Sequence, residues 1–334
     1  MIEEILKKEG FTEDEISKIT KASQIKTMKG ETLLKKYQAT LEFFTSLGYK
    51  KYEIRRMLKK SPALMCLDKE NVNLKLEYIE SLGYSKENIK RLMVFAPNIL
   101  SLTSKKIQEK FDFLKECGYK EEEIRKITTM FPYIYCRTTD YIKNKIDSME
   151  EYGYKRKDIL KMTIKLPAIY SYSKESLDKK MESLEKIGYT KNEIIRMTTN
   201  SPAILSYSID TMKEKIEILE GLTGSKEQAL WITKKFPSIF GNSKENIEEK
   251  VEYIKEIHAE EYVLHNPKNL MQSVELTYAR YRFFTEELGT NISKENISLL
   301  YRDEKKFKSF YGVTKKELIK KYDYTEKQKT KKKV

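Results

Sequence analysis

The sequence predicts an all-α solenoid of about eight helix-pair repeats, each about 35 residues long. Three features support this: the prolines are evenly spaced, a glycine keeps phase with them, and apolar residues recur at helical intervals. The prolines are Pro62, Pro97, Pro132, Pro167, Pro202, Pro237 and Pro267. Five successive intervals are 35 residues and the last is 30, which is typical of stacked repeats.

The first helix of each repeat is expected between a glycine and a proline. A Gly-Tyr pair begins fourteen residues before each of the first five prolines, at residues 48, 83, 118, 153 and 188. Isoleucine stands eight residues before the proline in these repeats, and an apolar residue stands five before it. The proline ends the helix, because it lacks an N–H donor and disfavours helical geometry in the residue that precedes it.

A short turn and a second helix are expected after the proline. The apolar residues that directly follow each proline predict one 3₁₀-like turn that packs inward. Six residues after the proline stands a residue suited to cap the second helix. These residues are Asp68, Thr103, Thr138, Ser173, Ser208, Ser243 and Ser273. Apolar residues ten, fourteen and seventeen positions after the proline keep helical spacing, and the next glycine ends the helix.

Both ends of the chain depart from the repeat. Residues 1–47 are expected to form a degenerate N-terminal capping repeat, and residues 48–288 the regular repeats. Residues 289–325 are expected to form a degenerate C-terminal capping repeat in which Lys308 takes the place of the proline. Residues 326–334, with five lysines, predict a disordered basic tail. Since no change of composition divides the chain, one domain with caps is expected.

Composition restricts the partner and the compartment. The chain has 65 Lys and Arg against 51 Asp and Glu, a net charge of +14, which favours a polyanionic partner. Three cysteines without a C-x-x-C motif indicate a reducing environment, and no apolar run is long enough to span a membrane. The N-terminus resembles neither a signal peptide nor a transit peptide. We expect a monomer in the cytoplasm or on a nucleoid, or in an organelle matrix if a presequence precedes this chain.

The pattern LGY-x₄-I-x₂-M-x₄-P-x-I-L, followed by S-x-E-x-L-x₂-K-x₃-L, resembles the mTERF repeat of mitochondrial transcription termination factors. The resemblance covers about residues 40–290 and is clearest in residues 83–117 and 188–222. It implies a curved solenoid of helix pairs with a short 3₁₀ helix and a basic concave groove that holds double-stranded nucleic acid. Family members act in organelle transcription, and some act on RNA or in ribosome assembly. Pentatricopeptide repeats share the period, but their proline closely follows the glycine.

One column of cations recurs thirteen residues after every proline. It consists of Lys75, Lys110, Lys145, Lys180, Lys215, Lys250 and Arg280. Equivalent positions of a solenoid stack into a line, so these side chains are candidate phosphate contacts. Alternatively, the lysine stems cover apolar surface while the ammonium groups stay in water or pair with a glutamate of the next repeat.

A second column lies six residues before the proline, on the side of the first helix opposite its apolar face. It consists of Arg56, Arg91, Lys126, Lys161 and Arg196. These residues could bind nucleic acid or form an ordinary solvated face. Trp231 takes the sixth place, where it could stack on a base or cover a neighbouring helix. The periodic tyrosines are expected to pack between repeats, Cys66 and Cys136 occupy a position for small residues, and Cys117 a core position.

The sequence gives little support for catalysis. Its two histidines, His258 and His265, have no accompanying cluster of metal ligands, and the chain lacks a glycine-rich phosphate loop and a nucleophile elbow. We therefore expect no enzyme activity, no cofactor and no metal. The sequence favours a protein that grips double-stranded DNA, in transcription termination or regulation. RNA binding on the same scaffold and a protein-interaction scaffold remain the alternatives.

Overall fold

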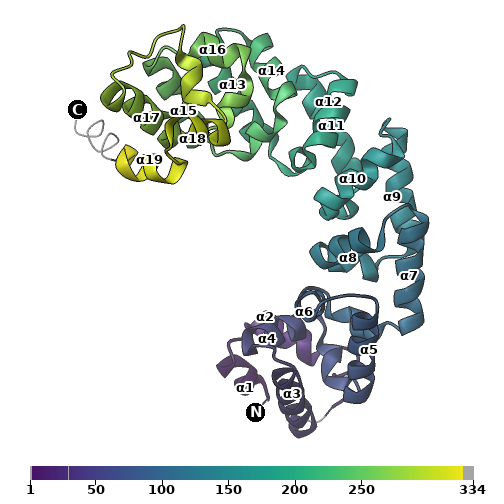
Figure 1. Ribbon diagram of the computed structural model, residues 1–334. Coiled ribbons are helices and arrows are strands. Elements are labelled where there is room, and N and C mark those ends of the chain that lie inside the picture. The colour runs from purple at the N-terminus through teal and green to yellow at the C-terminus, as the bar shows by residue number, and fades with distance from the viewer. Residues whose placement is uncertain (1, 29, 326–334) are drawn as a thin grey trace. The chain divides into compact units, whose positions relative to one another are not determined.

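The computed structural model describes residues 2–28 and 30–325, and the part it describes is an α-solenoid of repeated helix pairs (Figure 1). This confirms the predicted fold class. The chain divides into two compact units, Met1–Tyr172 and Ser173–Val334, which we describe separately. The boundary falls inside a repeat, between its 3₁₀ helix and its second helix. The predicted tail, residues 326–334, lies outside the described residues.

The first helix of each regular repeat ends just before a proline. The residue between the helix and the proline has left the helical region, as at Ser61, where φ is −143° and ψ is 83°. Steric conflict with the proline ring accounts for this geometry. These first helices are α4 (Lys51–Lys60), α6 (Lys86–Phe95), α8 (Glu121–Met130), α10 (Arg156–Lys165), α12 (Lys191–Asn200), α14 (Lys226–Lys235) and α16 (Glu260–His265).

A 3₁₀ helix begins at every proline, which confirms the predicted turn. Proline suits the first position because the N–H that it lacks would have no partner there. The seven 3₁₀ helices are η1 (Pro62–Cys66), η2 (Pro97–Ser101), η3 (Pro132–Cys136), η4 (Pro167–Ser171), η5 (Pro202–Ser206), η6 (Pro237–Gly241) and η7 (Pro267–Met271). An isoleucine or leucine near the middle of each, such as Ile134, is buried in the core.

The second helix of each repeat starts at the predicted cap. All seven capping side chains accept a hydrogen bond from the backbone N–H three residues later. These helices are α5 (Lys69–Ser81), α7 (Ser104–Glu116), α9 (Thr139–Glu151), α11 (Lys174–Ile187), α13 (Ile209–Thr223), α15 (Lys244–Glu256) and α17 (Val274–Arg282). Gly118 follows α7 with a φ of +105°, and a Cβ there would lie 3.1 Å from Leu160. Both the backbone conformation and the limited space therefore favour glycine at this junction.

In the N-terminal unit, the first helices of neighbouring repeats pack directly against one another. The series runs α2 (Glu13–Thr20), α4, α6, α8 and α10, while α3 (Gly30–Ser46), α5, α7 and α9 form a second row (Figure 1). The Tyr119 hydroxyl reaches into the next repeat, where it hydrogen bonds with Thr163 and with Tyr170, the latter at 2.6 Å. Tyr84 makes the same contacts with Thr128 and Tyr135. The prediction that these tyrosines pack between repeats is confirmed.

In the C-terminal unit, the row of second helices α11, α13, α15 and α17 makes consecutive contacts, and α12 also contacts α14. The tyrosine link persists in a reduced form. Tyr189 bonds to Thr233 at 2.6 Å, but Phe240 occupies the position that Tyr135 and Tyr170 hold in the N-terminal unit. The buried hydroxyl groups of this unit therefore form a shorter network.

The repeat around Pro267 is shortened at its first helix. Helix α16 has only six residues, and His258, with a φ of 54°, stands where other repeats have the glycine. Ala259 is fully buried in place of the tyrosine. Helix α17 then continues into a π-helical turn, η8 (Phe283–Glu287).

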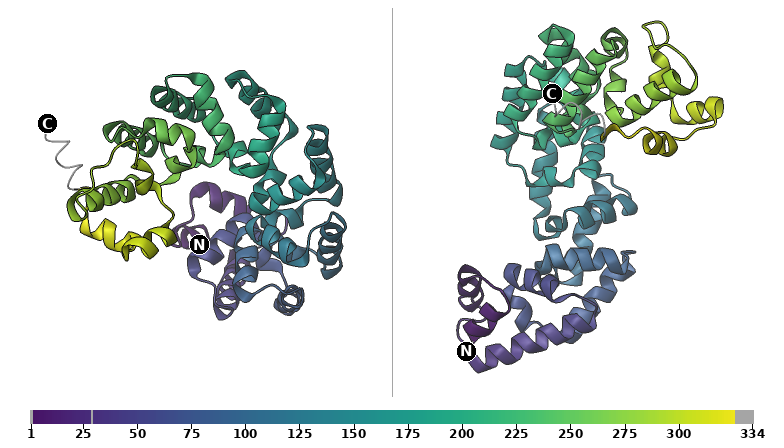
Figure 2. Two further views of the ribbon diagram at one scale, coloured as in Figure 1. Left: turned by 45° about the horizontal axis from the view of Figure 1, so that its top comes forward. Right: turned by 90° about the vertical axis from the view of Figure 1, so that its left-hand side faces the viewer.

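The C-terminal capping repeat is phased differently from our expectation. A 3₁₀ helix, η9 (Ile297–Tyr301), precedes α18 (Glu304–Tyr311), so Ile297 and not Lys308 takes the place of the proline. Asp303 caps α18 six residues after Ile297, as in the regular repeats. Lys308 is an exposed residue inside α18. Gly312 ends α18, and α19 (Lys315–Lys321) follows; both views in Figure 2 show this yellow segment at the end of the unit.

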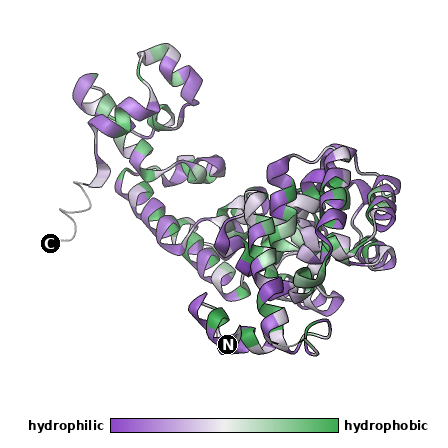
Figure 3. Cartoon of the chain, turned by 90° about the horizontal axis from the view of Figure 1, so that it is seen from below, coloured by the Kyte–Doolittle hydropathy of each residue, from purple (hydrophilic) through white to green (hydrophobic). Residues whose placement is uncertain are grey.

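The N-terminal capping repeat begins with α1 (Ile2–Lys8), which is followed by Gly10 in a left-handed conformation. Thr12 and Glu15 form a reciprocal capping box at the start of α2. Hydrophobic and hydrophilic colours alternate along individual helices in Figure 3, as expected for amphipathic helices around a core. Within the described residues, no helix combines the length and apolar character that a membrane span requires.

Candidate nucleic-acid interface

The cations thirteen residues after each proline lie at the junction between repeats. Each side chain leaves the second helix and donates a hydrogen bond to a backbone carbonyl at the end of the next 3₁₀ helix. The pairs are Lys75 with Leu100, Lys110 with Arg137, Lys145 with Tyr172, Lys180 with Tyr207, Lys215 with Phe240, and Lys250 with Leu270. Arg280 donates to Leu300 at 2.9 Å and to Arg302 at 2.7 Å, in the last repeat.

The chemistry of a 3₁₀ helix end explains why every repeat has a cation here. The last carbonyls of a helix have no partner within the helix, and their dipoles attract positive charge. Where burial keeps water from the carbonyl, as at Phe240 and Leu270, the donor must come from the protein. A long cationic side chain from the preceding repeat reaches them and supplies charge as well as N–H groups.

Burial of these cations increases toward the C-terminus. Lys75 and Lys110 are partly exposed, Lys145, Lys180, Lys215 and Lys250 are buried, and Arg280 is only 1% exposed. Desolvation lowers the pKa of Lys180 to about 8 and that of Arg280 to about 10. It also lowers the pKa of Lys75, Lys110, Lys215 and Lys250.

This position does not suit the phosphate track that we expected for these residues. Their charged groups are engaged by carbonyls of the protein, and most are out of reach of a ligand on the surface. The alternative, an ammonium group in water or paired with a glutamate, does not include the partner that the structure shows, which is a backbone carbonyl. We therefore assign the column a structural role as the clamp cations, which join each repeat to the next.

The column six residues before the proline is exposed in every member: Arg56, Arg91, Lys126, Lys161 and Arg196. In the N-terminal unit, Arg56, Arg91, Lys126 and Lys161 lie on α4, α6, α8 and α10, the first helices of four consecutive repeats. We call these four residues the basic row. Lys126, Lys161 and Arg196 form no hydrogen bond or ion pair with any residue that the structure describes. Their charges are therefore available to a partner.

Aromatic side chains accompany the start of the basic row. The guanidinium groups of Arg56 and Arg91 lie 4.2 Å and 5.2 Å from the centre of the Phe95 ring. Arg91 also donates through Nε to the carbonyl of Thr129 at 3.0 Å. Lys60 lies 5.1 Å from the Tyr133 ring, which is 39% exposed. These contacts restrain the cations without neutralising their charge, because neither an aromatic ring nor a carbonyl carries a negative charge.

The corresponding face of the C-terminal unit is less basic. After Arg196, the column continues with Trp231 and then with Glu261. Trp231 is 40% exposed and lies 5.9 Å from the ammonium group of Lys235. The N-terminal unit has 34 Lys and Arg against 25 Asp and Glu, whereas residues 173–300 have 18 against 21. Positive charge is thus concentrated in the N-terminal unit and in the residues after 300.

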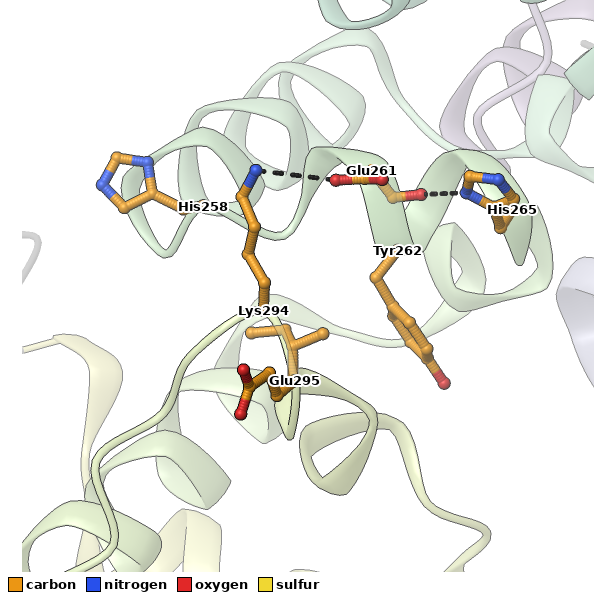
Figure 4. A pocket seen from close by; sticks show the side chains of 7 residues that line it. His258, Glu261, Tyr262, His265, Lys294 and Glu295 are labelled. Carbon is orange, nitrogen blue, oxygen red and sulfur yellow. Dashed lines mark hydrogen bonds and ion pairs between the residues drawn. The ribbon is translucent and has the colours of Figure 1, made fainter.

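The two histidines line a hollow of about 310 Å³ between α16 and the segment before η9 (Figure 4). They lie at opposite ends of it, and Nδ1 of His265 is 2.8 Å from the carbonyl of Glu261. Lys294 pairs with Glu261 at 3.5 Å. Within the described residues, no group of three or more His, Cys, Asp or Glu side chains is placed to hold a metal ion. The three cysteines are free thiols, and Cys117 is buried as predicted.

The comparison with known families agrees with the repeat architecture. The family model mTERF matches residues 2–149, 102–222 and 137–308, which together cover most of the chain. A search among curated proteins finds no match to this sequence. The mTERF family is a family of nucleic-acid-binding repeat proteins. The chain described here belongs to the mTERF family.

Proposed function

We propose that the protein binds double-stranded DNA through the basic row of its N-terminal unit, as a regulator or terminator of transcription. The observation that carries this proposal is the run of exposed cations on the first helices of four consecutive repeats. Two of these cations, Lys126 and Lys161, have no hydrogen-bond or ion-pair partner among the described residues. Phosphate groups are the usual partners of such side chains.

The spacing of the row suits a rigid polyanion. Packed helices lie ~10 Å apart, so four of them place their cations over roughly 30 Å. Double-stranded DNA rises ~3.4 Å per base pair, and this length corresponds to roughly nine base pairs. A duplex presents its phosphates in a fixed array, whereas a single strand would lose conformational freedom on matching the row. This favours a duplex over a single strand, and we propose DNA as that duplex.

The test compares two pairs of substitutions in the N-terminal unit. Lys126→Gln with Lys161→Gln removes two charges from the basic row, and Lys105→Gln with Lys143→Gln removes two exposed charges from the second helices α7 and α9. Binding to a 20-base-pair DNA duplex is followed by fluorescence anisotropy across salt concentrations. We expect the wild type to show a log-log salt slope of about −4, and the first pair to lower its magnitude by about 2.

The control pair should leave affinity and slope almost unchanged, because α7 and α9 lie in the other row of helices. Equal effects of the two pairs would show that binding follows net charge rather than the basic row. A preference for an RNA duplex or an RNA single strand over duplex DNA would replace DNA by RNA in the proposal. No binding at ~0.1 M salt would reject nucleic acid and point to a protein partner.

A further inference from the structure

The C-terminal cap is the most basic described part of the C-terminal unit. Residues 301–325 carry eight Lys and Arg against four Asp and Glu, whereas residues 173–300 carry 18 against 21. Five of these lysines are exposed and form no ion pair with any described residue: Lys305, Lys306, Lys308, Lys316 and Lys320. The cap is thus an isolated basic surface on a unit that is otherwise slightly acidic.

One aromatic ring stands out on this surface. Phe310, on α18, is 69% exposed, more than any other large hydrophobic side chain of the described protein. A single exposed phenylalanine near a chain end is ordinary. This one, however, has specific neighbours: the guanidinium group of Arg302 lies 4.7 Å from the ring centre, and its Nη1 donates to the Tyr311 hydroxyl at 3.3 Å. Arg302 is therefore fixed beside the ring.

Two cations accompany this ring. Lys306 and Phe310 are four residues apart on α18 and therefore share a face of the helix. Arg302 precedes α18 in extended conformation and reaches the same ring from the chain before the helix. Three residues before Phe310 on the same helix, Phe307 is 1% exposed and packs against Phe283 and Phe284. Folding therefore explains the orientation of Phe307 but gives no reason for an aromatic residue at position 310.

We infer that the stripe formed by Arg302, Lys306 and Phe310 is a second nucleic-acid contact, on which an unpaired base stacks against Phe310. An aromatic ring beside cations is the arrangement that binds single strands, because bases stack on the ring while the cations contact phosphates. The proposed function supplies only the class of partner, since the basic row lies in the other unit. A membrane surface fits less well, because a single exposed ring and a few lysines give only weak membrane attachment.

The test uses the full chain and two single strands with identical phosphates. One is a 15-nucleotide oligothymidylate, and the other is a 15-nucleotide strand without bases. Both strands would contact the basic surfaces equally, so the ratio of their dissociation constants reports stacking alone. We expect the wild type to bind the thymidylate strand roughly 5- to 100-fold more tightly. Phe310→Ala should lower this ratio at least about fivefold, whereas Phe310→Tyr should retain it.

Trp231→Ala is the matched control, because Trp231 is the exposed aromatic residue on α14 of the same unit. Trp231→Ala should leave the ratio of dissociation constants unchanged. If Trp231→Ala brings this ratio to about one while Phe310→Ala does not, the inference is wrong. A wild-type ratio near one would also overturn it, as would Phe310-dependent binding to phosphatidylserine vesicles without base preference. Phe310→Ala should change blunt-duplex affinity less than about twofold, so failure here is separable from failure of the basic row.

Discussion

The two units of the molecule are built from the same repeat. One of the two columns of cations is the same in both units, and the other changes from the N-terminal to the C-terminal unit. A cation thirteen residues after the proline bonds to the next 3₁₀ helix in both units. Six residues before the proline, the N-terminal unit has only cations, whereas the C-terminal unit has Arg196, Trp231 and Glu261. The position that never varies is thus the one the fold requires, and the position that changes is the one free to follow the partner.

The comparison also shows a gradient within the clamp cations. They are partly open to solvent in the first repeats and fully enclosed at Arg280. A buried acceptor that loses its donor cannot be rescued by water, whereas a partly exposed one can. The same chemical contact should therefore matter more in the C-terminal unit than in the N-terminal unit.

The largest effect is expected for Arg280→Met. It removes the donors to two carbonyls at a site that is 1% exposed, and we expect a loss of about 3 kcal/mol in the free energy of unfolding. Lys75→Met, at the exposed end of the gradient, should cost about 1 kcal/mol. Urea unfolding followed by far-UV circular dichroism measures both. Arg282→Met, on the same helix but with an exposed ion pair, should cost less than about 0.5 kcal/mol.

A pH-dependent effect should distinguish buried Lys180 from partly exposed Lys75. The pKa of Lys180 is about 8 in the folded chain, below the ordinary value of 10.5, because burial disfavours the charged amine. Between these values the unfolded chain binds a proton that the folded chain lacks, so stability rises with pH. We expect Lys180→Met to remove about 1–2 kcal/mol of the gain between pH 8 and 10, and Lys75→Met to remove less.

The measurement stops at pH 10 because buried tyrosines act in the opposite direction above it. Burial raises the pKa of Tyr119 to about 12, so the unfolded chain ionises first and stability falls beyond pH 10. If Lys180→Met kept the whole wild-type rise, the burial of this amine would not be the source of the pH dependence.

A further difference between the two units is expected in the tyrosine network. Tyr119→Phe removes one of two hydroxyl groups that bond to each other in the core of the N-terminal unit, leaving Tyr170 without this partner, and should cost about 1.5 kcal/mol. Tyr189→Phe should cost about 0.5 kcal/mol, because Thr233 still donates to backbone carbonyls. Thermal unfolding of the two variants compares them. Equal losses would show that the longer network of the N-terminal unit adds no stability.

Most of the architecture could be predicted because proline, glycine and capping residues act locally. The 3₁₀ helix at each proline and the cap six residues later follow from backbone chemistry alone. The phase of the repeat predicted for the C-terminal cap is wrong because an isoleucine, Ile297, stands at the proline position. The correct phase was still readable from Asp303, Phe307 and Tyr311, which stand six, ten and fourteen residues after Ile297, as their equivalents do after each proline.

The partner of the clamp cations could not be predicted in the same way. A repeated column shows that every copy has the same surroundings, but it does not show what those surroundings are. The acceptors are backbone carbonyls, which are present in every residue and leave no signal in the sequence. Regularity therefore favoured a ligand track where the structure has a joint between repeats.

The clamp gives the solenoid a direction that matters during synthesis. The carbonyl that accepts from each clamp cation lies 20 to 27 residues further along the chain. During synthesis, the contact of one repeat can therefore form only after the next 3₁₀ helix has left the ribosome. Truncating the chain from its C-terminus would leave a charged donor without its acceptor at the new end. Truncation from the N-terminus would instead expose carbonyls that water can bind, so the two ends of the protein should tolerate deletion unequally.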